Sequence, residues 1–153
     1  MQTTTQIQQL LETASTASME IRKLSNTKRQ YIWLTVAGMI EQRVNEIISE
    51  NEKDLVKMED HNPKKDRLRL TSERIQGLVD SVRDIVSLPD PTGNFLSEKQ
   101  LENGLIVQKL SVPLGVVGMI YESRPNVTID VAALCLRSGN GVVLRGGSDA
   151  FHS

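Results

Sequence analysis

The stretch that decides the fold is Pro113–Asp149, PLGVVGMIYESRPNVTIDVAALCLRSGNGVVLRGGSD. It holds a β-branched, apolar run at 116–121, a polar turn at 122–126 and an apolar, helix-compatible segment at 127–137. A stop at 138–141 precedes a second apolar run at 142–144, which predicts a buried strand. Strand, short helix and strand within about 30 residues predict a parallel βαβ crossover. The sequence therefore indicates an α/β fold with a parallel, Rossmann-like sheet that starts here.

Two polar clusters, Glu122–Asn126 and Arg145–Asp149, each follow a predicted strand. Ligands of open parallel sheets bind at the carboxyl ends of the strands. We therefore expect any binding function at these two clusters.

Composition excludes several classes of protein. The 153 residues are 39% hydrophobic and 24% charged, as in ordinary globular domains. Eighteen basic residues against 19 acidic ones leave a net charge of -1, which argues against nucleic-acid binding. No apolar run approaches the roughly 20 residues of a membrane span, and the first residues lack a secretory pattern, so we expect a cytoplasmic protein. One cysteine and two distant histidines predict neither a disulfide framework nor a metal site.

Upstream, apolar spacing predicts three helices. The first covers residues 5–23, and the second starts after Ser25 and continues, more polar, to about residue 60. Lys64–Arg67 is interpreted as a charged surface turn. Thr71 is placed to cap the third helix, which Pro89 and its neighbours end.

A hairpin is predicted between the helices and the βαβ unit. Strand-like segments at 94–98 and 105–112 flank Asn103-Gly104, a strong signal for a two-residue turn. Only one face of its second strand is strongly apolar, so the hairpin suits a sheet edge or a subunit contact outside the core.

The two polar clusters each allow two interpretations. Arg145-Gly146-Gly147-Ser148 can bring backbone amides and a cation to a phosphate, or it can be an ordinary tight turn with a solvated arginine. Arg124 can bind a carboxylate or phosphate, and the Asn126 amide can donate to a developing oxyanion. Alternatively, this second cluster is a capped helix start, with Asn126 or Thr128 as N-cap behind Pro125.

Two further features have a structural interpretation. Cys135 stands between leucines and is expected in the core. Gly139 and Gly141 lack the third glycine and the following helix of a dinucleotide fingerprint, so we expect them to end a helix.

The run 112–150, with PLGVVGMIYESRPNVT and LRGGSDA as its most specific parts, closely resembles the glutamate-5-semialdehyde dehydrogenases, also called gamma-glutamyl phosphate reductases. This family belongs to the aldehyde dehydrogenase superfamily and acts in proline biosynthesis. The resemblance extends upstream through 24–25, 51–55, 66–68 and 88–91, and covers only the N-terminal portion of a much longer family enzyme.

The resemblance implies NADPH-dependent reduction of L-glutamyl 5-phosphate to L-glutamate 5-semialdehyde and phosphate. It implies a cysteine nucleophile beyond Ser153, so that no nucleophile lies in this chain and the chain alone is inactive. It places Arg145, Gly146, Gly147 and Ser148 against the cofactor, with Arg145 and Ser148 at the 2′-phosphate. Arg124 and Asn126 become candidates for substrate and oxyanion contact.

The resemblance also implies an organisation of the chain. Residues 1–92 correspond to the helical N-terminal part of the nucleotide-binding domain, 93–112 to a hairpin for homo-oligomerisation, and 113–153 to the first, truncated βαβ of the NADPH-binding domain. The other function that we consider is a non-catalytic module that binds subunits or nucleotide.

Overall fold

The computed structural model describes residues 2–153. The predicted order of helices, hairpin and βαβ unit is confirmed. In chain order the elements are α1 (Gln2–Lys23), α2 (Asn26–Gln42), α3 (Val44–Leu55), α4 (Lys64–Leu68), α5 (Ser72–Ser87), β1 (Phe95–Gln100), β2 (Ile106–Leu110), β3 (Val116–Ile120), α6 (Pro125–Arg137), β4 (Gly141–Arg145) and the single 3-10 turn η1 (Ser148–Ala150).

Strands β3 and β4 pair in parallel, with Val116 opposite Gly141 and Ile120 opposite Arg145. Helix α6 connects them and ends at Arg137, followed as predicted by the stop at 138–141, in which Gly139 has a φ of 74°. The Gly139 amide donates to the Leu136 carbonyl at 3.1 Å, and the Asn140 amide to the Cys135 carbonyl at 2.8 Å. These two bonds satisfy carbonyls that a helix end leaves free, and the left-handed backbone that they need favours glycine.

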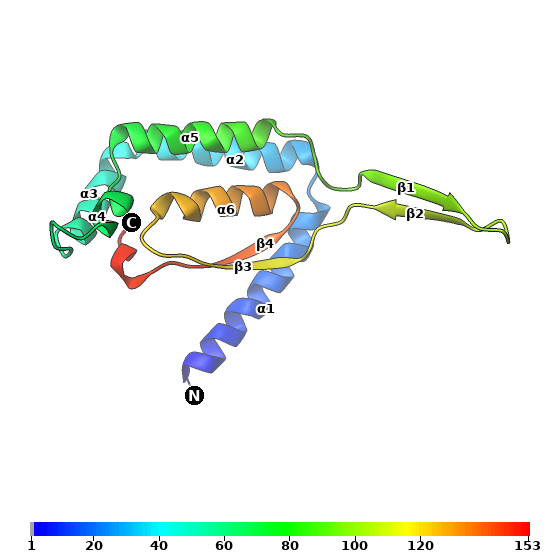
Figure 1. Ribbon diagram of the computed structural model, residues 1–153, viewed down its shortest axis with the longest axis horizontal. Helices are drawn as coiled ribbons and strands as arrows, with labels where there is room; N and C mark the ends of the chain where they lie inside the picture. The colour runs from blue at the N-terminus through cyan, green and yellow to red at the C-terminus, as the bar shows by residue number, and fades with distance from the viewer. Residues whose placement is uncertain (1) are drawn as a thin grey trace.

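Helix α6 lies between the pair α2–α5 and the two-stranded sheet (Figure 1). The apolar stripes expected on α2 and α5 meet α6 in the core, where each buried aliphatic side chain contributes about 1.5–3 kcal/mol. Cys135 is buried, as expected, but the β4 strand is only half-buried rather than buried. The core cluster comprises Trp33, Ala37, Leu78, Val79, Val82, Ile85, Val86 and Ala133.

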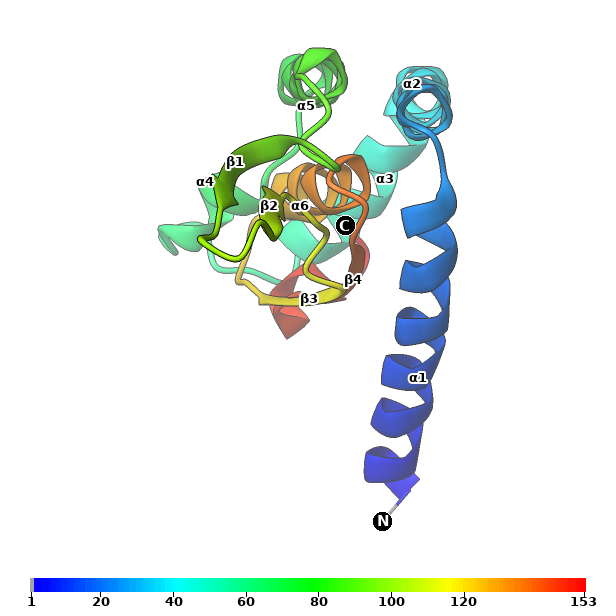
Figure 2. The ribbon, with the colours of Figure 1, turned by 90° about the vertical axis from the view of Figure 1, so that its right-hand side faces the viewer.

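Helix α1 runs beside the sheet and extends well past the rest of the chain (Figure 2). Gly141 permits this contact, because a Cβ there would lie 2.9 Å from the Ser18 Cβ and 3.2 Å from the Ala14 carbonyl oxygen. The apolar side chains of the first turns, which predicted the helix, stay about half exposed: Ile7, Leu10 and Leu11.

The single long helix expected after Ser25 is wrong, because it divides at Arg43 (φ −114°, ψ 19°) and ends at Leu55. The Arg43 amide donates to the Ile40 carbonyl, three residues back, which tightens the last turn of α2. No proline or glycine marks this break. The surface turn expected at Lys64–Arg67 is instead the short helix α4, started by the Asn62 side chain, which accepts from the Lys64 amide at 2.9 Å.

The hairpin forms as predicted, but its two-residue turn is wrong. The Leu101 amide donates to the Leu105 carbonyl at 2.8 Å, which leaves a three-residue loop. Gly104 has a φ of 85° and donates its amide to the Leu101 carbonyl at 2.9 Å, the pattern of a type I turn followed by a left-handed residue. Every residue of β1 and β2 is exposed, and the hairpin projects away from the helices (Figure 1).

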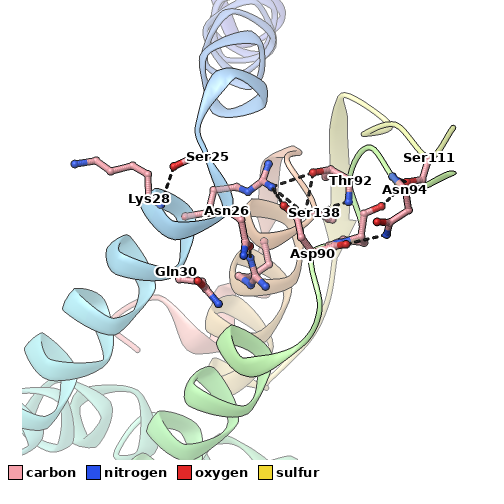
Figure 3. Close-up of polar contacts among 12 residues, drawn as sticks. Ser25, Asn26, Lys28, Gln30, Asp90, Thr92, Asn94, Ser111 and Ser138 are labelled. Carbon is pink, nitrogen blue, oxygen red and sulfur yellow. Dashed lines mark hydrogen bonds and ion pairs between the residues drawn. The ribbon is translucent and has the colours of Figure 1, made fainter.

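Polar contacts fix the base of the hairpin to α2 (Figure 3). The buried Arg29 guanidinium donates to both carboxylate oxygens of Asp90, at 2.7 and 2.9 Å, and to the Thr92 hydroxyl at 3.0 Å. Asn94 continues the chain of contacts, since its amide N–H donates to the Ser111 hydroxyl at 2.9 Å and its side chain to the Asp90 carbonyl at 2.8 Å. Arg29 therefore links α2 to the segment that leads into the hairpin.

Candidate functional site at the carboxyl edge of the parallel sheet

The two polar clusters meet at the carboxyl edge of the sheet. The Tyr121 amide donates to the Arg145 carbonyl at 3.1 Å, which extends the β3–β4 pairing by one residue. One loop further on, the Ser123 hydroxyl donates to the Asp149 carboxylate. The expectation that each cluster lies at the carboxyl end of a strand is confirmed, and the structure also places the two clusters side by side.

The turn Arg145–Ser148 presents the groups that a phosphate needs. Arg145 and Ser148 are exposed, and Arg145 has no carboxylate at ion-pair distance within residues 2–153. A Cβ at position 147 would collide with the Asp149 carboxylate and lie 3.7 Å from the Glu122 Cα. A Cβ at position 146 would touch the Tyr121 ring at 3.6 Å. The glycines keep this turn close to the loop after β3, and its cation and hydroxyl stay free for an anion.

The segment after this turn is fixed by a residue that the sequence reasoning missed. The Asp54 carboxylate, on α3, is buried and accepts from the His152 amide at 2.8 Å, the Ser153 amide at 2.9 Å and the Ser153 hydroxyl at 2.8 Å. Asp54 thus holds His152 and Ser153, the last two residues of the segment that follows the turn. In the sequence Asp54 is one acidic residue in a polar helical segment (Asn-Glu-Lys-Asp), and nothing there signals its burial.

The loop Glu122–Asn126 differs from the capped start that we considered. Arg124, not Asn126 or Thr128, occupies the N-cap position of α6, no side chain caps the helix, and Pro125 is its first residue. The Thr128 hydroxyl instead lies 2.5 Å from the Tyr121 hydroxyl. Asn126 makes only a long contact of 3.4 Å to Asp130 within its own helix. The N-cap interpretation is wrong because Pro125 moves the helix start one residue ahead of Asn126.

Arg124 and Asn126 line an open cleft of about 480 Å³. Its opposite wall comes from α4, α5 and the segment between them, and it contributes three more arginines: Arg67, Arg69 and Arg74. The cofactor-turn residues 145–148 are not part of its lining, so the two candidate groups share an edge of the sheet but not one cavity.

The arginines of the far wall were not linked to the site by the sequence reasoning. Arg67 and Arg69 alternate with Leu68 and Leu70, and Leu68 is fully buried. This alternation turns the two arginines away from the core. The alternation thus predicts that Arg67 and Arg69 are exposed, but it does not predict that Arg124 lies across the cleft from them.

Cys135 is not a candidate nucleophile. It is buried in α6, and burial raises the pKa of its thiol, which disfavours the reactive thiolate. Within residues 2–153 no group of three or more His, Cys, Asp and Glu side chains is arranged to hold a metal ion. In the same range no helix has both the length and the apolar character needed to cross a membrane.

Comparison with curated proteins identifies close relatives. The chain is 46% identical over 150 residues to the gamma-glutamyl phosphate reductase of Bacteroides thetaiotaomicron, which covers 98% of this chain and 36% of that protein. It is 48% identical to the gamma-glutamyl phosphate reductase of Chlorobium luteolum, over 96% of this chain and 35% of that protein. The chain thus spans about a third of the length of the curated relatives. No family model matches it.

Solved structures agree. The gamma-glutamyl phosphate reductase of Thermotoga maritima superposes with a TM-score of 0.86 at 32% identity, over 92% of this chain and 35% of that one. The enzyme of the same name from Saccharomyces cerevisiae gives 0.87 at 27% identity, over 94% and 37%. A probable aldehyde dehydrogenase from Listeria monocytogenes, at 17% identity and a TM-score of 0.61, shares the fold alone. Along the third of the family's length that it spans, the chain belongs to the gamma-glutamyl phosphate reductases.

Proposed function

We propose that the chain is part of an NADPH-dependent reductase that converts L-glutamyl 5-phosphate to L-glutamate 5-semialdehyde and phosphate in the cytoplasm. The observation behind this proposal is the free cation at the carboxyl edge of the sheet, in a chain so similar to gamma-glutamyl phosphate reductases. The relatives' name supplies the reaction, and the edge supplies the groups for a phosphorylated cofactor and substrate.

In this proposal Arg145 and Ser148 bind the 2′-phosphate of NADPH, and Gly146 and Gly147 let the nucleotide approach the backbone. The bound cofactor supplies a hydride. Arg124 holds an anionic group of the substrate, and Asn126, whose side-chain amide makes only a 3.4 Å contact in its own helix, donates to the oxyanion that forms at the carbonyl.

The covalent step needs a thiolate, and the single cysteine of this sequence is buried. We therefore expect nucleotide binding but no turnover from the 153-residue chain. Turnover of L-glutamate 5-semialdehyde with NADP and phosphate by the purified chain would overturn this expectation.

The experiment for the cofactor is a calorimetric titration of the 153-residue chain with NADPH and with NADH. Arg145→Ala removes one charge-assisted contact, so we expect NADPH affinity to fall about tenfold and NADH affinity to stay within about twofold. Arg22→Ala, an exposed arginine at the end of α1, is the matched control. Equal losses for both nucleotides, or no loss, would reject a role of Arg145 at the 2′-phosphate.

A second candidate function, subunit interaction through residues 93–112, is favoured by the exposed hairpin. Large apolar side chains on both strands are about half exposed, among them Leu96, Ile106 and Leu110. A two-stranded ribbon also leaves two edges with free backbone groups, and a second copy of the chain is the proposed occupant. Sedimentation should show a homo-oligomer that Ile106→Glu dissociates and that Lys109→Gln, an equal change of charge on the other face of β2, does not; a monomeric native chain would contradict it.

A further inference from the structure

The cleft beside α6 has an excess of positive charge that the protein itself leaves unpaired. Four guanidinium groups line it against two carboxylates. Asp66 is paired with Arg74 at 3.0 Å, and Asp130 accepts from the Ser81 hydroxyl at 3.1 Å. Among residues 2–153, Arg67, Arg69 and Arg124 have no carboxylate at ion-pair distance. Nearby Glu122 is held by Lys64 at 3.1 Å.

The start of α6 adds to this charge. Arg124 and Asn126, from the N-cap and the first turn, line the cleft, and no side chain caps this 13-residue helix. Pro125 has no N–H and the Val127 amide donates to the Arg124 carbonyl at 3.0 Å, so Asn126 is the first-turn residue whose amide has no acceptor within residues 2–153. The positive end of the helix dipole and free amides at such an end favour an anion.

A buried side-chain amide holds the backbone of the far wall, the wall that α4, α5 and the segment between them supply. Asn51 is 1% exposed; its side-chain nitrogen donates to the Leu68 carbonyl at 2.9 Å, and its oxygen accepts from the Leu70 amide at 2.8 Å. This pair of bonds brackets Arg69. Arg67 and Arg69 therefore line a cleft of about 480 Å³ from a backbone segment that is already held in place. Less of the backbone has to become ordered when an anion binds.

We propose that this cleft binds the phosphate group of a small phosphorylated molecule through the guanidinium groups of Arg67, Arg69 and Arg124. Planar guanidinium groups suit phosphate because each can donate two parallel hydrogen bonds. The site is separate from the Arg145 turn. The identity of its natural ligand rests on the proposed function, which makes that ligand the acyl phosphate substrate. Phosphate binding at the cleft does not depend on that function.

The test is an NMR titration of the isotope-labelled 153-residue chain with inorganic phosphate and with acetyl phosphate, following the arginine Nε–H resonances. We expect the resonances of the three arginines to shift together at millimolar ligand. Arg67→Ala and Arg69→Ala should each weaken binding about tenfold, and Arg69→Glu should abolish it. Arg22→Ala, which removes the same charge far from the cleft, should leave the affinity within twofold. Arg67 and Arg69 are exposed, so the variants should keep the native fold.

Two controls separate this proposal from the proposed function. Arg145→Ala should leave phosphate binding at the cleft unchanged, whereas Arg69→Glu should leave NADPH affinity unchanged. Acetyl phosphate binding more tightly than sodium glutamate would support the phosphate as the recognised group. The proposal is overturned if phosphate shifts none of the three arginines, if Arg22→Ala weakens binding as much as Arg69→Ala, or if NADPH displaces phosphate from the cleft.

Discussion

Ser123 donates its hydroxyl hydrogen bond to the Asp149 carboxylate, and so ties the loop after β3 to the turn after β4. Ser123 is 2% exposed and has a φ of 42°, a left-handed conformation that costs a residue other than glycine about 1–2 kcal/mol. A residue other than glycine that keeps this backbone conformation has to be stabilised by its contacts. The bond to Asp149 is the contact that the structure supplies, at the edge where both candidate binding groups meet.

Two substitutions separate the contribution of this hydrogen bond to stability from that of the backbone conformation. Ser123→Ala loses the bond to a charged acceptor and keeps the unfavourable φ, so the free energy of unfolding should fall by about 2 kcal/mol. Ser123→Gly also loses the bond but adopts this φ without a steric penalty, and it should be about 1 kcal/mol more stable than Ser123→Ala. Urea denaturation measures both. Equal stability of the two variants would show that the backbone conformation is not under strain.

Asp90 should contribute stability that disappears in acid. Burial alone would raise the pKa of its carboxyl, but the amide and hydroxyl of Thr92 and the guanidinium of Arg29 outweigh burial, so the pKa lies below its ordinary value. A lowered pKa in the folded state stabilises the protein above the unfolded value of about 3.9, and this stabilisation is lost as pH falls through the folded value.

The variant Asp90→Asn removes this contribution and leaves the buried Arg29 without an anionic partner. Its free energy of unfolding at neutral pH should be lower by about 2–3 kcal/mol. The difference from the native protein should shrink below about pH 4. Asp84→Asn, on the exposed side of α5, is the control. A difference that stays constant down to pH 2 would refute the ionic role of Asp90.

The parts of the fold that sequence reasoning found are those with local causes. A hydroxyl before an apolar stripe predicted the α5 cap, where the Thr71 side chain accepts from the Arg74 amide at 3.2 Å. A glycine after an apolar segment predicted the end of α6. Two apolar, strand-like runs on either side of a helix-compatible segment in 113–149 predicted the parallel pair β3–β4. The two helix ends depend on residues within one turn, and the parallel pair follows from a strand–helix–strand succession that is contiguous in the chain, which is why the sequence contains the information.

The parts that it missed depend on tertiary contacts. Arg43 breaks α2 from α3 without a proline or glycine. The two helices have different tertiary partners, since α2 packs against α5 and α6 whereas α3 contacts α4, α5 and η1, and such contacts override local propensity. The cleft joins Arg67 and Arg69 to Arg124, 57 and 55 positions later in the chain, and no spacing rule connects them. The same is true of Asp54, whose three hydrogen bonds come from His152 and Ser153, 98 and 99 residues away.

Asp54 should control the order of the segment after the candidate cofactor turn. Asp54→Ala leaves the amides of His152 and Ser153 without their acceptor, so stability should fall by about 2 kcal/mol and hydrogen exchange across 147–153 should accelerate. Lys53→Ala, its exposed neighbour on α3, should change neither. Unchanged exchange at the Ser153 amide in Asp54→Ala would argue against a positioning role.

Gly139 should tolerate no side chain, for two reasons that act together. Its φ of 74° disfavours any other residue, and a Cβ there would lie 2.8 Å from the Pro113 Cγ and 3.1 Å from Arg29 Nη1. Gly139→Ala should therefore lower the free energy of unfolding by about 3 kcal/mol, with shares from backbone conformation and from displacement of the buried arginine. Gly38→Ala is the matched control: Gly38 lies inside α2, and apart from the helix's own backbone no atom lies within 4 Å of its Cβ position. This substitution should stabilise the protein by about 0.5–1 kcal/mol. Because Arg29 also holds Asp90, Gly139→Ala should reduce the acid-dependent part of the stability as well. If stability falls but its pH dependence does not change, the whole effect comes from the backbone conformation of residue 139.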